Sequence, residues 1–373
     1  MKNLKTYKMF ESSVALTSEQ VEWLDECTKG TWQLNPQTGL VDVDGDFNCV
    51  GQGLSDFKGV RFGKVGKDFY CHDNQLTTLE GAPLNVRGGF SCYSNRLTSL
   101  EGAPEKVGGG FWCGINQLTT LVGAPRKVGG RFHCRNNRLT SLEGAPQEVR
   151  GSFYCDNNRL TTLEGAPQKV GGDFYCNDNQ LTTLVGAPQK VRKDFYCNNN
   201  ELTSLVGAPQ VVGGDFSCVE NQLTSLEGAP QEVRGNFSCI DNRLTSLEGA
   251  PQKVGRDFSC RNNQLITLEG APQEVGGAFS CSNNQLTSLE GAPQEVGWDF
   301  IWSNNPVSEK TLKRIFGIMK KGESYLEAVE SLWPEIPVED QALLYRPEFE
   351  WIVGDERRKL DALRAYQGFK GMI

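Results

Sequence analysis

Histidine is nearly absent from this chain of 373 residues, which has only two, and long apolar segments are missing altogether. No stretch approaches the roughly 18 consecutive apolar residues that a membrane-spanning helix requires. Residues 1–13 also lack the apolar core of a classical signal peptide. From these absences we expect a protein that has no membrane partner and stays in the cytoplasm of the cell that produces it.

An excess of basic residues is missing as well. The chain has 38 lysines and arginines and 46 aspartates and glutamates, so its formal net charge is −8. Binding to a phosphate backbone needs a basic stripe that neutralises the phosphates, and we therefore expect no nucleic-acid partner. The two signs of charge are also interspersed, which argues against a mimic of nucleic acid.

The scarcity of histidine removes the side chain most often used as a general base or metal ligand. Neither histidine accompanies a nucleophile at triad spacing, and the glycine-rich segments match neither a dinucleotide fingerprint nor a calcium-binding repeat. The carboxylates of the C-terminal region have no diagnostic spacing: Glu323, Glu327, Glu339 and Asp340. We expect no catalytic residue, no cofactor and no metal ion, so an enzyme is the weakest hypothesis.

Twelve of the thirteen cysteines follow a nearly fixed period. Eleven of them, from Cys71 to Cys281, recur every 21 residues, and Cys49 precedes the series by 22. A fixed period indicates one structural position per repeat rather than a set of disulfide bridges. The Phe-x-Cys pattern begins at Phe47 and ends in a thirteenth copy, in which Trp302 replaces the cysteine. Thiolates can bind soft metals, but a cysteine turned into the core behaves as a small apolar side chain.

Each repeat predicts one short strand. In the motif Asp-Phe-Tyr-Cys-Asn, phenylalanine and cysteine point to one side of the strand and their neighbours to the other. Strands that follow one another at this period would pair in parallel, about 4.8 Å apart. An asparagine column from Asn74 to Asn305 would be buried, and we expect its amides to bind backbone groups of the turns. The pattern therefore predicts a repeat solenoid with a continuous core.

The N-terminal end of the array predicts a cap, because a solenoid must cover its terminal apolar cross-section. A helix is expected over residues 17–29, with Thr17 and Gln20 forming a capping box. Its apolar face would carry Trp23 and Leu24. Two short segments after the helix are expected to be leading strands.

The C-terminal end predicts a helical cap. Ser308 is a suitable N-cap for a first amphipathic helix, and a last helix is expected over 355–367. Between them, a second helix is expected to carry its apolar side chains at Leu326, Val329, Leu332 and Trp333. We expect Trp298 and Trp302 to pack against these helices. As an alternative, the helical region is itself a docking module. The predicted domains are an N-terminal cap at 1–45, a thirteen-repeat solenoid at 46–306 and a C-terminal helical cap at 307–373.

The repeat resembles those of known families. The pattern F-x-C-x-x-N-x-L-T-x-L is similar to the leucine-rich-repeat core L-x-L-x-x-N-x-L-x-x-L, and the tail L-T-S-L-x-x-A-P is similar to repeats of bacterial type III secreted leucine-rich effectors. The longer pattern L-T-S-L-E-G-A-P-x-x-V-G-G-x-F-x-C-x-x-N resembles repeat proteins encoded by large tailed bacteriophages. The resemblance implies a leucine-rich-repeat-like right-handed coil. A ubiquitin-ligase activity found in some effectors needs a catalytic cysteine, and none follows Cys281.

The outward positions of the strands predict the functional surface, because packing constrains the inward ones. The position between phenylalanine and cysteine is mainly aromatic in the first half of the array and serine in the second. Neighbouring rings can simply stabilise a sheet, or they can form a binding patch rich in tyrosine and tryptophan. We predict the following partner-binding residues: Tyr70, Tyr93, Trp112, Arg131, His133, Arg135, Tyr154, Asp173, Tyr175, Asp194 and Tyr196.

The position before each phenylalanine places Asp173, Asp194 and Asp215 on three consecutive strands. Like charges directly opposite destabilise a sheet, so either solvent screens them or a partner offsets them. We expect a partner with a basic or mixed-charge surface. The leading hypothesis is a non-enzymatic module that binds a host or viral protein as an inhibitor or scaffold in the producing or infected cell. The alternative is a structural virion or assembly component, and self-association stays open.

Overall fold

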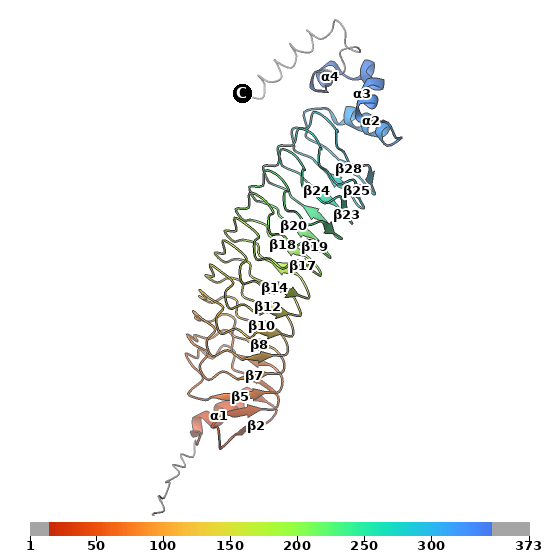
Figure 1. Cartoon of the computed structure of the whole chain (residues 1–373). Helices are drawn as coiled ribbons and strands as arrows, with labels where there is room; N and C mark the ends of the chain where they lie inside the picture. The colour runs from red at the N-terminus through yellow and green to blue at the C-terminus, as the bar shows by residue number, and fades with distance from the viewer. Residues whose placement is uncertain (1–14, 345–373) are drawn as a thin grey trace, which may run out of the picture. The chain divides into compact units, whose positions relative to one another are not determined.

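The chain divides into two compact units, Met1–Tyr154 and Cys155–Ile373, and the computed structural model describes residues 15–344 of it (Figure 1). The described part of the first unit begins with a helix and two strands that pair antiparallel, and that of the second ends with helices. The other strands of each unit are stacked in parallel. The longest described helix has 11 residues. Among residues 15–344, no helix combines the length and apolarity needed to cross a bilayer.

The Phe-x-Cys motif forms a parallel strand in successive repeats, as predicted. Equivalent residues lie opposite one another, so that Phe111 pairs with both Phe90 and Phe132. In the first unit these strands are β4 (Asp46–Asn48), β6 (Phe69–Tyr70), β8 (Phe90–Ser91), β10 (Phe111–Trp112), β12 (Phe132–His133) and β14 (Phe153–Tyr154). In the second unit they are β16 (Phe174–Tyr175), β18 (Phe195–Tyr196), β20 (Phe216–Ser217), β22 (Phe237–Ser238), β24 (Phe258–Ser259), β26 (Phe279–Ser280) and β28 (Phe300–Ile301).

Each repeat also contains a second short strand, where the sequence predicts only one. Most of these strands have two residues, of which one is a buried valine, so they show no alternation that a sequence pattern could detect. In the first unit they are β3 (Val41–Val43), β5 (Phe62–Val65), β7 (Asn85–Val86), β9 (Lys106–Val107), β11 (Lys127–Val128) and β13 (Glu148–Val149). In the second unit they are β15 (Lys169–Val170), β17 (Lys190–Val191), β19 (Val211–Val212), β21 (Glu232–Val233), β23 (Lys253–Val254), β25 (Glu274–Val275) and β27 (Glu295–Val296).

The core of each unit is built on a stack of phenylalanine rings. In the first unit the ring centroids of Phe90 and Phe111 are 5.3 Å apart, and those of Phe111 and Phe132 are also 5.3 Å apart, with nearly parallel planes. All three side chains are fully buried. Burying one such ring contributes roughly 1.5–3 kcal/mol, so the period of the sequence is also the period of the apolar core.

The cysteines lie inside this core as free thiols. Cys71 donates its Sγ–H to the carbonyl of Ser91 in the next repeat, at 3.2 Å, and Cys134 similarly bonds the carbonyl of Tyr154. Burial raises the pKa of the Cys71 thiol well above its usual range. The ladder therefore consists of neutral, hydrogen-bonded thiols that pack as small apolar groups.

The asparagine column binds backbone groups as predicted. Asn116 donates from Nδ2 to the carbonyls of Cys92, Cys113 and Gly114 at 3.0–3.2 Å. Its Oδ1 accepts the backbone N–H of Leu97 at 3.0 Å. Each amide thus closes the turn of its own repeat and ties it to the preceding repeat.

The N-terminal cap is a helix with antiparallel strands. Helix α1 (Ser18–Cys27) begins with the predicted capping box between Thr17 and Gln20 and buries Trp23 and Leu24. Strand β1 (Thr28–Lys29) pairs antiparallel with β4, and β2 (Trp32–Leu34) pairs antiparallel with β3. Both sheets of the first unit therefore have a covered first edge, which blunts pairing with other chains.

The C-terminal cap packs on the last strand of the second unit. It consists of α2 (Glu309–Met319), α3 (Tyr325–Leu332), a short 3-10 turn (Trp333–Glu335) and α4 (Val338–Leu344). Ser308 is the N-cap of α2 and accepts the N–H of Thr311, as predicted. The ring of Phe316 lies 4.4 Å from that of Phe300 and 5.7 Å from that of Trp302. The predicted helix at 355–367 lies outside the described residues.

Two expectations for this cap are wrong. Trp298 was expected to pack on the helices, but it is 74% exposed, whereas Trp302 is buried. Trp302 follows the inward alternation of the strand, and Trp298 precedes the strand in a position where other repeats have glycine or a polar residue. Leu326 is also exposed, because α3 turns Ala328 and Val329 inward instead.

Candidate functional site

The most distinctive surface of the first unit lies around Trp112 on β10. Its indole ring covers Gly89 and Gly110, which precede the phenylalanines of two consecutive repeats. A Cβ atom added at Gly89 would lie 2.6 Å from the ring, and one added at Gly110 would lie 2.5 Å from it. Only glycine leaves room for the ring at these two positions, and sequence reasoning did not single out either residue.

The ring of Trp112 begins an aromatic stack across three neighbouring strands. Its centroid is 6.3 Å from that of His133 on β12, and the centroid of His133 is 4.1 Å from that of Tyr154 on β14. The planes are nearly parallel, at 23° and 7°. All three side chains are half-buried. The structure thus brings three predicted residues into one continuous aromatic surface.

The imidazole of His133 is neutral in this stack. Burial is the main cause that lowers its pKa to about 4, and the charges of Arg135 and Arg131 contribute in the same direction. Both arginines are exposed beside the rings. The surface therefore combines a neutral aromatic centre with cationic side chains.

Two predicted tyrosines lie in the repeats that precede Trp112. Tyr70 donates its hydroxyl to Asp68 at 2.7 Å, and that hydrogen bond is the main cause that raises the Tyr70 pKa to about 12. The ring of Tyr93 reaches Gly114, where an added Cβ atom would lie 3.3 Å from it. Gly114, like Gly89, therefore lies against an aromatic ring of a neighbouring repeat.

Ile115 follows Gly114 and adopts a left-handed backbone conformation, with φ of 48°. The equivalent position in other repeats is mostly asparagine or aspartate, which tolerate this conformation. A β-branched residue there is strained, and its side chain is 43% exposed. This exposed apolar residue lies in the same repeat as Trp112, and the sequence analysis missed it.

The aspartates before the phenylalanines have a structural role that the sequence did not reveal. Asp194 Oδ1 accepts the backbone N–H of Asp215 at 2.8 Å, and Asp215 Oδ1 accepts that of Asn236 at 2.7 Å. In the first unit Asp68 Oδ1 accepts the N–H of Gly89 in the same way. Backbone N–H groups therefore offset the predicted repulsion between like charges, and neither a cation nor a basic partner is required.

In the second unit the predicted residues form a smaller group. The rings of Tyr175 and Tyr196 stack at 4.9 Å, and Tyr196 donates its hydroxyl to Asp194 at 3.3 Å. Burial, followed by the charge of Asp194, raises the pKa of Tyr196. This pair is hydrogen-bonded to an aspartate that precedes a phenylalanine. It does not lie on a pair of glycines such as Gly89 and Gly110 under Trp112, which we call the glycine platform.

The eleven predicted residues consequently fall into two groups, one on each compact unit. Tyr70, Tyr93, Trp112, Arg131, His133, Arg135 and Tyr154 belong to the first unit, and Asp173, Tyr175, Asp194 and Tyr196 belong to the second.

Two of the four carboxylates considered for catalysis form hydrogen bonds at the start of a helix. Asp340 accepts hydrogen bonds from Ser308 and Thr311 at the start of α2, and Glu327 forms a capping box with Ser324. Within residues 15–344, no three histidine, cysteine or acidic side chains come together as a potential metal site. These interactions account for two of the four C-terminal carboxylates as helix caps.

No protein-family model and no curated protein matches the chain. Among solved structures it is similar to YopM from Yersinia enterocolitica, with 21% identity and a TM-score of 0.49, over 77% of this chain and 68% of that one. It is also similar to YopM from Yersinia pestis, which is described as a leucine-rich effector protein. The identity is 20% and the TM-score 0.41, over 70% of this chain and 83% of that one.

A third similar structure is the functional domain of InlJ from Listeria monocytogenes, which is described as including a cysteine ladder. Its identity is 16% and its TM-score is 0.33, over 66% of this chain and 64% of that one. Likenesses of this size bear on the fold alone. The leucine-rich-repeat-like architecture itself follows from the in-register strands and from the asparagine and cysteine ladders described above.

Proposed function

We propose that this chain is an interaction module that binds a protein partner through the aromatic surface of its first unit, centred on Trp112, His133 and Tyr154. The observation that carries the proposal is the position of the Trp112 ring over Gly89 and Gly110. Tryptophan and tyrosine are the residues most enriched among those that dominate binding energy at interfaces. The exposed Ile115, three residues after Trp112 in the same repeat, adds an apolar side chain to this unit's surface.

The glycine platform favours binding over a purely stabilising role for the rings. Elsewhere an aspartate at this position accepts a backbone N–H of the next repeat. Such a bond contributes about 1 kcal/mol, and Gly89 and Gly110 cannot make it. The chain also tolerates the strained backbone of Ile115 in the same repeat. Departures from a repeat rule that lower stability are expected at functional sites.

The charges suggest the chemistry of the partner. Arg131 and Arg135 are exposed beside the aromatic stack, while the aspartates of the second unit are engaged with backbone N–H groups. We propose a partner surface of mixed charge with an apolar centre. We further propose a host or viral protein, bound by an inhibitor or scaffold in the cytoplasm of the producing or infected cell, because the repeats resemble phage-encoded ones.

Affinity capture followed by mass spectrometry tests this proposal. Wild type would be compared with Trp112→Ala/Tyr154→Ala and with the matched control Tyr175→Ala/Tyr196→Ala in the second unit. Circular dichroism would establish that each variant is folded. We expect one captured protein to be lost with the first variant and retained with the second.

Other outcomes of the capture have definite meanings. Loss of the captured protein only with the Tyr175/Tyr196 variant would move the site to the second unit. Equal capture by all three proteins would exclude both aromatic groups. Recovery of only the chain itself, or of virion proteins, would favour the structural role.

A further inference from the structure

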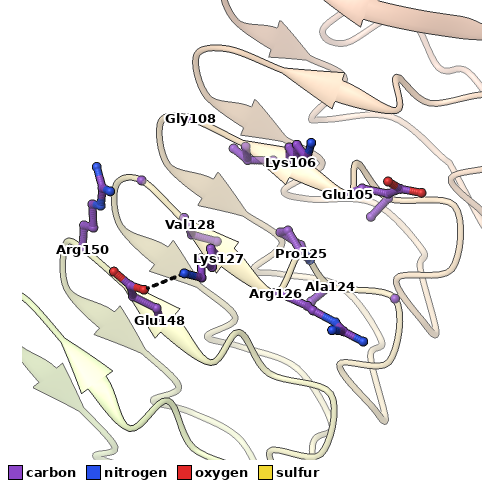
Figure 2. A pocket seen from close by; sticks show the side chains of 14 residues that line it. Glu105, Lys106, Gly108, Ala124, Pro125, Arg126, Lys127, Val128, Glu148 and Arg150 are labelled. Atoms are coloured by element: carbon purple, nitrogen blue, oxygen red, sulfur yellow. Dashed lines mark ion pairs between the residues drawn. The ribbon is translucent and has the colours of Figure 1, made fainter.

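The second sheet of the first unit contains a hollow that the proposed aromatic site does not use. Its volume is about 730 Å³ and its lining comes from three consecutive repeats, at β9, β11 and β13 (Figure 2). The apolar residues that line it are Ala103, Val107, Ala124, Pro125 and Val128. Their small side chains leave space for an aliphatic group.

The rim of this hollow carries more cations than anions. Four basic side chains line it, against two acidic ones. They are Lys106, Arg126, Lys127 and Arg150, with Glu105 and Glu148. The Lys127 Nζ and Glu148 Oε2 atoms form an ion pair at 3.2 Å, and Figure 2 shows Arg126 and Arg150 on opposite sides of Lys127. All four basic residues are exposed, so the rim has a net positive charge on a chain whose net charge is −8.

The repeat architecture does not require this imbalance, as an equivalent place in the second unit shows. A hollow of about 480 Å³ is lined by β23, β25 and β27 together with Lys320. Its charges are balanced, with Lys253 and Lys320 against Glu274 and Glu295. Lys253 and Glu274 form an ion pair there. The excess of cations is therefore not shared by this second hollow.

The basic character continues along the first unit. A neighbouring hollow shares Lys106 and Gly108 with the first. Its three cations outnumber its two acidic residues, and its lining also includes one aromatic residue: Lys64, Arg87 and Lys106, with Asp42, Asp44 and Trp32. From β5 to β13 there are four strand steps, a span of roughly 19 Å at about 4.8 Å per step. An extended peptide of about six residues covers that length at about 3.3 Å per residue.

We propose that this basic groove binds an extended acidic peptide segment of a protein partner, with a small aliphatic side chain of the peptide in the apolar hollow. Alternate residues of an extended peptide point to the same side, so its carboxylates can face Lys106, Lys127 and Arg150 in succession. Complementary charge at such a rim sets specificity and the rate of association. The groove uses different strands from the Trp112 surface and does not depend on that assignment.

The lining favours a peptide over a single-stranded nucleic acid. Nucleic-acid grooves combine positive charge with aromatic side chains on which successive bases stack. No aromatic residue lines the hollow at β9, β11 and β13, and the neighbouring hollow has one, Trp32. Glu105 and Glu148 would also lie against a phosphate backbone. A peptide can satisfy the same rim, because its own lysine or backbone N–H groups can meet the two glutamates.

Fluorescence anisotropy with a labelled peptide of sequence Glu-Glu-Val-Glu-Val-Glu-Glu tests the proposal at low and physiological salt. The full chain would be compared with Lys106→Glu/Lys127→Glu and with Lys253→Glu/Lys320→Glu, which makes the same charge change at the balanced hollow. We expect the first variant to bind at least about tenfold more weakly and the second to bind like wild type. Lys106→Arg/Lys127→Arg, which keeps both positive charges, should bind the peptide like wild type.

A second peptide tests the apolar hollow, because replacing both valines by asparagine should weaken binding at least about threefold through lost apolar burial. Equal affinities of the two charge-reversal variants would overturn the proposal, since they would reduce the interaction to overall charge. Tighter binding of a labelled oligouridylate, lost in Lys106→Glu/Lys127→Glu, would also overturn it in favour of nucleic acid. Circular dichroism of each variant separates these outcomes from misfolding.

Discussion

At the scale of single residues, His133 shows how packing sets the chemistry of a side chain. The imidazole is stacked between Trp112 and Tyr154, beside Arg131 and Arg135. Both burial and the neighbouring cations disfavour its charged form. The residue that would ordinarily titrate near neutral pH is therefore a neutral aromatic ring in this surface.

This environment predicts an unusual titration. In a His72→Gln variant, His133 is the only histidine, and its ring protons followed by NMR should titrate near pH 4. Because the folded pKa lies below the unfolded value of about 6.5, the unfolded chain takes up the proton first as the pH falls. The contribution of His133 to stability is then lost between about pH 6.5 and pH 4. A midpoint near 6.5 in the folded protein would show that the ring is solvated.

At the scale of the strand, the position before each phenylalanine can hold either an aspartate or a glycine covered by the Trp112 ring. The aspartate side chain and the indole ring would occupy the same space. Aspartate ties each repeat to the next through a backbone N–H, as Asp68 does with Gly89. Gly89 and Gly110 have no side chain, so the Trp112 ring lies directly over them. The two arrangements exclude each other because an added Cβ atom would already overlap the indole.

This competition predicts that Gly89→Asp changes the free energy of unfolding in opposite directions with and without the Trp112 ring. In a Trp112→Ser background, Gly89→Asp should raise the free energy of unfolding by about 1 kcal/mol, because the carboxylate can accept a backbone N–H of the next repeat. In the wild-type background the same change should lower it, because the ring must move. Urea unfolding measures both, with Gly89→Ala as the control that adds a Cβ atom without an acceptor. A gain in both backgrounds would mean that Trp112 does not occupy this space.

At the scale of the whole molecule, each unit depends on its cap. The apolar ladder of the second unit ends at Phe300 and Trp302, which Phe316 of α2 covers. A repeat array gains stability from contacts between neighbours, so an end without a cap loses them on one side.

Phe316→Ala should therefore weaken the end of the second unit. We expect a loss of about 3–5 kcal/mol, the usual effect of truncating a buried phenylalanine. Hydrogen exchange of β26 and β28 should accelerate most, because these strands lie nearest the cap. Met319→Ala, at a half-buried position of the same helix, should have a smaller effect. Unchanged exchange of β28 would argue that α2 does not stabilise the strand beneath it.

The amino-acid sequence by itself determined the repeat and its inward ladder. Phenylalanine, cysteine, asparagine and leucine recur at one period, and alternation within a short segment decides which side chains face the core. The capping box at Thr17 and the N-cap at Ser308 are equally local signals, readable from a few consecutive residues. Such features depend on chemistry within one repeat, so the structure confirms them.

Only the tertiary structure decided how residues of different repeats combine. The Trp112 ring lies on glycines of two repeats, Asp194 finds its partner in the following repeat, and the cations of the basic groove come from three. The exposure of Trp298 was likewise visible only in the structure. The physical reason is that the pattern within one repeat decides which side chains face the core, whereas the surface is shaped by side chains about 21 residues away in the sequence.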